Sequence, residues 1–162
     1  MKTDFSVLLR TLSGGRVDFI LVGGLAAAAH GAARATYDVD VLYARGLDNL
    51  KRLVDALVPL KPYLRGAPPG LPFFFDEQTL AKGLNFTLTT IAGDLDLLGE
   101  VTYGGTYETM APNSEMVAAF GIECRCLSLD QLIVVKRAVG RVKNLEALAE
   151  LEAIAEERRR QC

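Results

Sequence analysis

Two pairs of aspartates have the residue type and the spacing of a metal site. Asp38 and Asp40 flank Val39 at the start of an apolar run, and Asp94 and Asp96 repeat the pattern further along the chain. Side chains two residues apart in a strand share a face, and neighbouring ionised carboxylates repel each other unless a cation lies between them. Mg²⁺ prefers such oxygen ligands and bridges them to substrate phosphates. If the two strands are neighbours, three or four carboxylates converge, as a two-metal phosphoryl-transfer site requires.

The third metal ligand is expected to be Asp96, because an apolar run begins directly after it. Asp94 follows Gly93 and fits the alternative of capping a tight turn, although it stays a candidate ligand. For the first pair, the alternative is that one aspartate caps a turn while the other faces solvent. The apolar strand that follows Asp40 argues against that alternative.

A pair of glycines precedes the first aspartates. Residues 17–22 predict a buried strand, Gly23 and Gly24 end it, and residues 25–30 predict a helix. Glycines let a backbone approach a ligand closely, and the free N–H groups of a helix start favour an anion such as triphosphate. Taken alone, the pair fits an ordinary tight turn equally well.

The elements that must position these residues form an alternating pattern. Helices are expected at residues 3–13, 25–30, 48–58, 76–82, from 128 onward and at about 145–159, and strands at 17–22, 39–43, 85–90, 94–98 and 122–127. The proline-rich residues 59–72 are predicted to form a surface loop. Strands and helices alternate early, strands cluster in the middle and helices close the chain. The pattern predicts an α/β (α+β) fold, a mixed β-sheet flanked by helices, in one domain over residues 1–162.

Length, charge and cysteine content exclude several classes. A net charge of −2 gives no bulk attraction to nucleic acid, so contact with a polynucleotide needs a local basic patch. No apolar run approaches the ~18 residues of a membrane span, and the N-terminus lacks the features of a signal peptide. Three cysteines are too few and odd in number for a disulfide framework, which fits a reducing cytoplasm. The single histidine, His30, is expected to pack at a helix end.

The glycine pair followed by D-V-D resembles the signature of the nucleotidyltransferase superfamily that includes DNA polymerase beta. Residues 25–37 separate the two motifs, and Asp96 in GDLDLLGEV matches the third carboxylate of that signature. More closely, RATYDVDVL with LSLDQLIVVKRAVGRVKNL is similar to small prokaryotic nucleotidyltransferase-like proteins, which include toxin-type and abortive-infection-type members. The resemblance covers about residues 17–152. It implies a nucleotidyltransferase fold with a catalytic core at about 17–127 and C-terminal helices at 128–160.

The resemblance also implies roles for individual residues. The three carboxylates Asp38, Asp40 and Asp96 would bind Mg²⁺ or Mn²⁺, and Asp96 would act as a base on the acceptor hydroxyl. The glycines would cradle the nucleotide phosphates. The full set implied to bind nucleotide is Gly23, Gly24, Arg34, Thr36, Lys136, Arg137 and Arg141. Lys136 is expected to meet the triphosphate, although the basic residues of this helix also fit a solvated helix face.

The implied activity is metal-dependent transfer of a nucleoside monophosphate from an NTP to a hydroxyl on RNA, a protein or a small molecule. A toxin-type enzyme would in addition have an antitoxin partner. Two departures from the pattern favour an alternative: Gly24 stands where many members carry Ser, and Asn144 where the similar proteins often carry Asp. That alternative is a catalytically degenerate module that binds a nucleotide or a partner.

Two further points stay open in the sequence. The apolar side of the last predicted helix fits either internal packing or a homodimer, and its residues are Leu145, Leu148, Leu151 and Ile154. An unrelated α/β fold, in which the glycines form a generic turn and the aspartates lie in surface loops, also remains an alternative.

Overall fold

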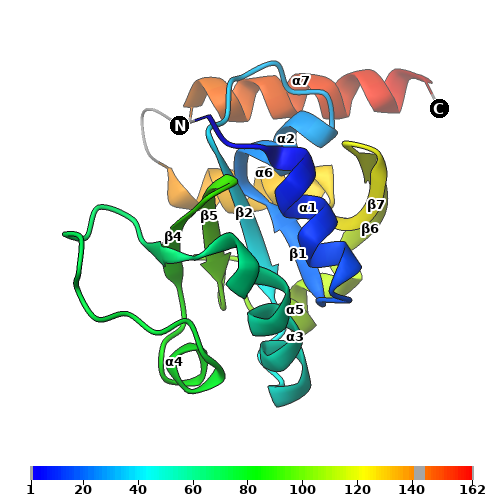
Figure 1. Cartoon of the computed structure of the whole chain (residues 1–162). Helices are drawn as coiled ribbons and strands as arrows, with labels where there is room; N and C mark the ends of the chain where they lie inside the picture. The colour runs from blue at the N-terminus through cyan, green and yellow to red at the C-terminus, as the bar shows by residue number, and fades with distance from the viewer. Residues whose placement is uncertain (1, 141–144, 162) are drawn as a thin grey trace.

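The computed structural model describes residues 2–140 and 145–161 (Figure 1). The helices are α1 (Phe5–Gly14), α2 (Gly23–Ala29), α3 (Leu47–Leu57), α4 (Glu77–Lys82), α5 (Tyr107–Met110), α6 (Leu129–Val139) and α7 (Leu145–Gln161), with the 3₁₀ turns η1 (Val58–Leu60) and η2 (Ala111–Asn113). The strands are β1 (Phe19–Val22), β2 (Asp38–Tyr43), β3 (Tyr63–Leu64), β4 (Phe86–Thr90), β5 (Gly93–Leu98), β6 (Ser114–Ala119) and β7 (Ile122–Leu127). These residues therefore form an α/β structure with a mixed sheet, in agreement with the class predicted from the sequence.

The seven strands form one sheet in the order β3-β4-β5-β2-β1-β7-β6. Strand β2 pairs in parallel with β5, and the register sets Asp38 opposite Asp94 and Asp40 opposite Asp96. On its other side β2 pairs antiparallel with β1, where Val22 lies opposite Asp40. The two strands that carry aspartates are thus neighbours, which is the condition that the sequence alone left open.

Helices lie on both sides of the sheet. In Figure 1, α1 and α3 cover the near face, α6 lies behind the sheet and α7 runs across the top of the view. Helix α1 is capped by the side chain of Asp4, which accepts from the N–H of Val7, and it buries Leu8, Leu9 and Leu12. The apolar residues that alternate with the aspartates in β2 and β5 are buried on one face of the sheet. Their burial places the aspartates on the opposite face.

Helix α6 lies over the other face and has clear signals at both ends. Ser128 accepts a hydrogen bond from the N–H of Gln131, and Gly140 ends the helix in the left-handed conformation at φ 64°. Helix α7 packs beside α6 and buries Leu151 and Ala155. Leu145 is exposed. Most of the apolar side of α7 is therefore used internally, and the homodimer stays a prediction.

Several boundaries differ from those predicted. The proline-rich residues 59–72 contain β3, which forms an edge of the sheet by pairing with β4. Strand β6 was not predicted, because Ser114–Ala119 has little of the β-branched and aromatic character that marks strands. Strands β2 and β5 begin at Asp38 and Gly93, so that all four aspartates lie inside strands.

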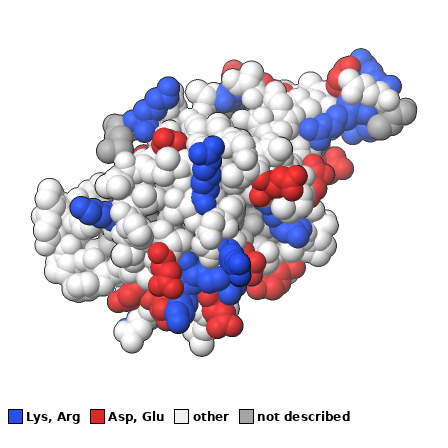
Figure 2. All heavy atoms as spheres, turned by 45° about the vertical axis from the view of Figure 1, so that its right-hand side comes forward, with Lys and Arg blue, Asp and Glu red and all other residues white. Residues whose placement is uncertain are grey.

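Charge is mixed over the surface in view. Figure 2 shows basic and acidic side chains side by side, at the lower end of this face and along the C-terminal part of α7. This face therefore offers no broad patch of a single sign, of the kind that polynucleotide binding uses. Within the described ranges, no helix combines the length and the apolar character needed to cross a bilayer.

Candidate functional site

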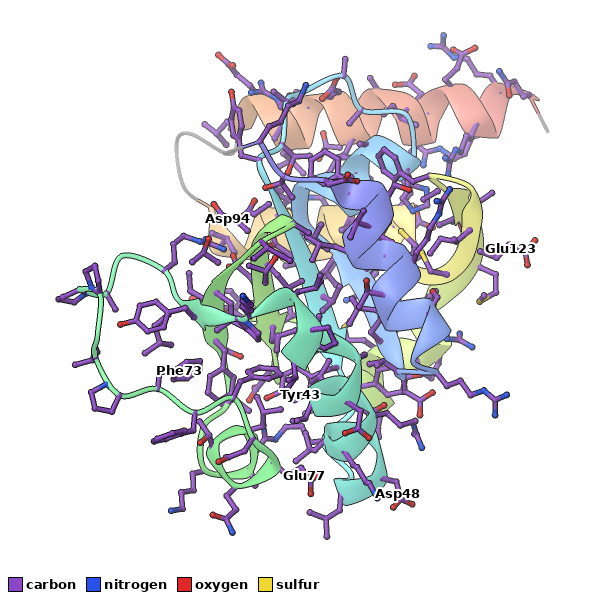
Figure 3. The ribbon with its side chains drawn as sticks, in the orientation of Figure 1. Tyr43, Asp48, Phe73, Glu77, Asp94 and Glu123 are labelled. Carbon is purple, nitrogen blue, oxygen red and sulfur yellow. The ribbon has the colours of Figure 1, made fainter. Side chains whose placement is uncertain are left out.

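Three carboxylates from adjacent strands converge on the α6 side of the sheet. One oxygen from each of Asp38, Asp40 and Asp96 lies within 4.8 Å of the others. Oxygen ligands of Mg²⁺ lie about 2.0–2.1 Å from the ion, so oxygens on opposite sides of one ion are about 4 Å apart. Small side-chain adjustments would therefore let all three carboxylates bind one cation. Asp94, which is labelled on β5 in Figure 3, does not belong to this set of three.

The ionised forms of Asp38 and Asp40 are disfavoured by their surroundings. Burial, followed by the charge of Asp38, raises the pKa of Asp40 to about 8. Burial, followed by the charge of Asp96, also raises the pKa of Asp38. Among the described residues, buried Asp40 Oδ1 has no hydrogen-bond partner. An unpaired, buried carboxylate oxygen is costly, and a bound cation would relieve this cost.

The absence of a side chain at Gly23 allows Asp40 its position. Gly23 begins α2 with φ 70°, and a Cβ atom placed on it would overlap Asp40 Oδ2. A larger residue would therefore combine left-handed backbone strain with a collision at the carboxylate. Gly23 therefore makes room for a predicted metal ligand, and its predicted contact with phosphate stays a prediction.

Gly24 and Thr36 also share one space. A Cβ on Gly24 would lie 2.9 Å from Thr36 Oγ1, whose hydroxyl donates to the carbonyl oxygen of Asp38 at 3.3 Å. Serine at position 24 would therefore require Thr36 to move. This contact gives a physical reason for the departure at position 24: the hydroxyl near this turn comes from Thr36.

The most important residue that the sequence analysis missed is Arg65, directly after β3. Its Nη2 lies 2.8 Å from Asp96 Oδ1, its Nε 3.4 Å from Asp94 Oδ1 and its Nη1 3.8 Å from Asp38 Oδ2. One guanidinium thus faces three of the four aspartates. Its position in a proline-rich segment hid it. The signal that could have revealed it is electrostatic, since four clustered carboxylates require a nearby cation.

Lys136 on α6 lines two pockets, one beside Asp40 and one beside Gly24. The first pocket has a volume of about 170 Å³ and is mostly apolar, with Asp40 and Lys136 as its charged residues. Its lining is Val22, Gly23, Asp40, Leu98, Val101, Leu127, Leu132, Val135, Lys136 and Val139. The second, of about 210 Å³, is lined in part by Gly24, Arg34 and Lys136. Lys136 therefore lies between the carboxylates and the space beside Gly24.

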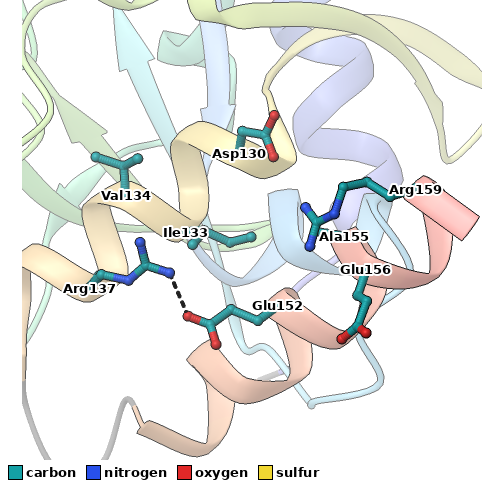
Figure 4. A pocket seen from close by; sticks show the side chains of 8 residues that line it. All are labelled: Asp130, Ile133, Val134, Arg137, Glu152, Ala155, Glu156 and Arg159. Carbon is teal, nitrogen blue, oxygen red and sulfur yellow. Dashed lines mark hydrogen bonds and ion pairs between the residues drawn. The ribbon is translucent and has the colours of Figure 1, made fainter.

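The other predicted basic residues are less close to the carboxylates. Arg34 lines the second pocket, but its Nη2 lies 2.9 Å from Glu146 on α7. Arg137 Nη2 lies 2.7 Å from Glu152, in the groove between α6 and α7 that Figure 4 shows. Arg141, like Asn144, lies outside the described residues.

His30 packs at the end of α2, as predicted. It is buried, and its Nε2 lies 2.8 Å from the carbonyl oxygen of Leu127 at the end of β7. Arg158 on α7 donates to the carbonyl oxygen of His30 at 3.2 Å. Cys126 lies 3.8 Å from the imidazole, and burial raises the pKa of its thiol to about 12, so the thiol stays protonated at neutral pH. This cluster connects α2, β7 and α7 and is structural.

The arrangement as a whole combines clustered carboxylates, a glycine turn and a lysine between two pockets. Carboxylates of this kind bind hard divalent cations, and a lysine beside them can bind phosphate oxygens. Phosphoryl transfer needs these two capacities side by side. No family model and no curated protein matches the chain.

Proposed function

We propose that this protein is a nucleotidyltransferase of the DNA polymerase beta-type superfamily, which uses Mg²⁺ or Mn²⁺ to transfer a nucleoside monophosphate from an NTP to a hydroxyl group. The observation that carries the proposal is the convergence of Asp38, Asp40 and Asp96 within 4.8 Å on adjacent strands. Asp40 Oδ1, which has no hydrogen-bond partner in the part of the chain that the structure describes, supports the proposal because a cation stabilises such an atom.

In the proposed reaction, Asp38, Asp40 and Asp96 would hold the cation. A bound cation would supply Lewis acidity that lowers the pKa of the acceptor hydroxyl and neutralises charge on the phosphates. Asp96 would accept the hydroxyl proton as the acceptor oxygen bonds to the α-phosphorus. The bond from that phosphorus to the bridging oxygen breaks, and pyrophosphate leaves with the electron pair.

The phosphates would lie in the pocket beside Gly24. Lys136 and Arg34 line this pocket of about 210 Å³, and Lys136 also borders Asp40. Lys136 is therefore the residue expected to balance the charge that develops on pyrophosphate. Thr36 provides a hydroxyl group at the same turn.

The acceptor would be a hydroxyl on RNA, a protein or a small molecule. A toxin-type member would in addition be neutralised by an antitoxin partner. These parts of the proposal rest on the resemblance in RATYDVDVL and the C-terminal basic segment.

One observation favours a second candidate function. Arg65 already neutralises part of the carboxylate charge, with its Nη2 2.8 Å from Asp96. If this guanidinium stayed bound to the carboxylates in place of a metal ion, the protein would be a catalytically degenerate module. Such a module would bind a nucleotide or a partner without metal-dependent turnover.

A thermal-shift screen against the four NTPs, with and without Mg²⁺, tests the proposal. A nucleotide at about 100 times its Kd should stabilise the protein by about 2.7 kcal/mol. The Asp38→Asn/Asp40→Asn variant should lose the Mg²⁺-dependent part of the shift. Asp48→Asn/Asp55→Asn is the matched control, because it changes the charge equally at exposed positions of α3.

Turnover is measured with α-labelled NTPs by label transfer and pyrophosphate release. Metal-dependent transfer that Asp38→Asn/Asp40→Asn abolishes and the control retains would support the enzyme. Transfer that persists in the site variant would exclude this site. Nucleotide binding without any turnover would favour the degenerate module.

A further inference from the structure

Arg65 lies where a positive charge is needed most. Its guanidinium contacts Asp96 at 2.8 Å, Asp94 at 3.4 Å and Asp38 at 3.8 Å, and its side chain is 28% exposed. Two of these partners, Asp38 and Asp96, also belong to the set that could bind a metal ion. Asp94 does not, so its oxygen is a partner of Arg65 alone within this cluster.

The backbone of Arg65 is fixed while its side chain is long. The N–H of Arg65 donates to the carbonyl oxygen of Thr87 at 3.0 Å, next to the pairing of Leu64 with Leu88. From this anchor the side chain passes over β4, where Nη2 donates to the carbonyl oxygen of Leu88 at 2.7 Å. The guanidinium can therefore change partners by side-chain rotation, without a change in the sheet.

A cation and the observed guanidinium compete for the same two carboxylates, those of Asp38 and Asp96. A divalent ion would bind Asp96 at about 2.0–2.1 Å. Arg65 Nη2 is 2.8 Å from Oδ1 of the same residue, so the two positive charges would lie close together in a partly buried site. Their repulsion, together with the loss of the attraction to Asp38 and Asp96, weakens the observed position of Arg65.

We propose, resting on the proposed function, that a bound cation displaces Arg65 from Asp38 and Asp96, and that the guanidinium keeps its contact with Asp94 and binds the nucleotide triphosphate. The planar fork of arginine suits this exchange, because it binds carboxylate and phosphate oxygens with the same geometry. Asp94 is then a positioning residue: its charge attracts the guanidinium through the 3.4 Å ion pair with Nε, which forms no hydrogen bond within the described residues, while the terminal N–H groups turn to phosphate.

The exchange makes metal and triphosphate binding cooperative. A cation alone must break the ion pairs of Arg65 with Asp38 and Asp96. When triphosphate is present, the displaced guanidinium gains new partners, so each ligand improves the binding of the other. Arg65 thus prevents the site from holding a metal ion firmly before the nucleotide arrives.

The test measures the affinity for Mn²⁺ alone and then for inorganic triphosphate with Mn²⁺, by calorimetry. Arg65→Gln should bind Mn²⁺ alone about tenfold more tightly, because the competing charge is gone, and should bind triphosphate about tenfold more weakly. Arg65→Lys should resemble the wild type with Mn²⁺ alone, and should bind triphosphate less tightly than the wild type because it lacks the fork. Arg52→Gln is the control, since Nη2 of Arg52 lies 3.4 Å from Asp18 Oδ2 and, among the described residues, none of its ion pairs involves the site carboxylates.

The Asp94→Asn variant tests the positioning role of Asp94 while leaving the charge of Arg65 in place. We expect its affinity for triphosphate to fall several-fold, and its affinity for Mn²⁺ to change less. Circular dichroism verifies that each variant is folded before its titration.

The outcomes separate this proposal from the proposed function. Equal or weaker Mn²⁺ binding by Arg65→Gln overturns the displacement and leaves the nucleotidyltransferase proposal intact. Tighter Mn²⁺ binding with unchanged triphosphate affinity overturns the transfer to phosphate. If Mn²⁺ binds only to Arg65→Gln and not to the wild type, the proposal of a metal-dependent enzyme is overturned. Arg65 is then the permanent positive charge that balances the carboxylates. No binding by any variant overturns both proposals.

Discussion

Strands β2 and β5 present apolar side chains on one face of the sheet and carboxylates on the other. Val41 and Leu97 are 0% exposed and belong to the hydrophobic core. Their neighbours Asp40 and Asp96 lie on the face toward α6, where like charges converge and Asp40 Oδ1 has no partner among the described residues. The two faces differ only by one step of the chain, because successive residues of a strand point to opposite sides.

The comparison separates what stabilises this protein from what it can bind. The apolar face is complete without a ligand, and its residues stabilise the fold by burial. On the carboxylate face, burial and repulsion disfavour the ionised forms of Asp38 and Asp40, and a cation would reverse that effect. Substitutions on the two faces should therefore have opposite consequences for the stability of the protein without metal.

The largest effect is expected from Leu97→Ala on the apolar face. Removing a side chain that is fully buried leaves a cavity and should lower the free energy of unfolding by about 2–5 kcal/mol. Urea denaturation measures this change, with Asp96→Asn, the adjacent residue on the opposite face, as the control. A loss below about 1 kcal/mol for Leu97→Ala would show that this face is not tightly packed.

Gly23→Ala tests the boundary between the two faces. The left-handed backbone should cost about 1–2 kcal/mol, and the overlap with Asp40 Oδ2 should displace that carboxylate and weaken metal binding. Gly140→Ala is a matched control, because φ is 64° there and the nearest atom to an added Cβ is 3.8 Å away. The control should lose similar stability and keep its Mn²⁺ affinity. Equal Mn²⁺ binding by both variants would contradict the role of Gly23.

The third prediction concerns pH. The pKa of Asp40 is raised from 3.8 to about 8, so the folded state binds more protons than the unfolded state between these values. Without metal, the contribution of Asp40 to stability is therefore present below pH 4 and is lost as the pH rises through about 8. Asp40→Asn should remove this loss and be more stable than the wild type by about 1 kcal/mol at pH 9.

Melting curves from pH 5 to about 9 in EDTA measure this contribution. With Mg²⁺ the trend should reverse for the wild type, because the cation binds ionised Asp40 and its affinity rises up to about pH 8. Exposed Asp48→Asn serves as the reference for the loss of one charge. Identical pH profiles for Asp40→Asn and the wild type would contradict the conclusion that ionised Asp40 destabilises the folded protein.

The carboxylate face could be predicted from the sequence because its signals are local. The D-x-D spacing sets the shared face, and Gly23 marks the end of the preceding strand. The partner strand required one assumption, that β5 lies beside β2, and the structure meets it.

Arg65 could not be predicted in the same way. It reaches the carboxylates because Tyr63 and Leu64 pair with Thr89 and Leu88, far along the chain. A strand of two residues has no periodicity to detect, and the prolines around it favour a loop. The position of Arg65 therefore depends on tertiary pairing, which local patterns do not encode.

The smallest effect on stability is expected on α6, which covers the carboxylate face. Arg137 pairs with Glu152 at an exposed site, so Arg137→Gln should change the free energy of unfolding by at most about 0.5 kcal/mol and leave triphosphate binding unchanged. Lys136→Gln, one residue earlier, should weaken triphosphate binding about tenfold, because Lys136 borders both Asp40 and the pocket beside Gly24. Calorimetry with Mn²⁺ and triphosphate compares the two. Equal losses would mean that the basic residues of α6 attract the anion through general charge, and that the carboxylate face has no lysine dedicated to phosphate.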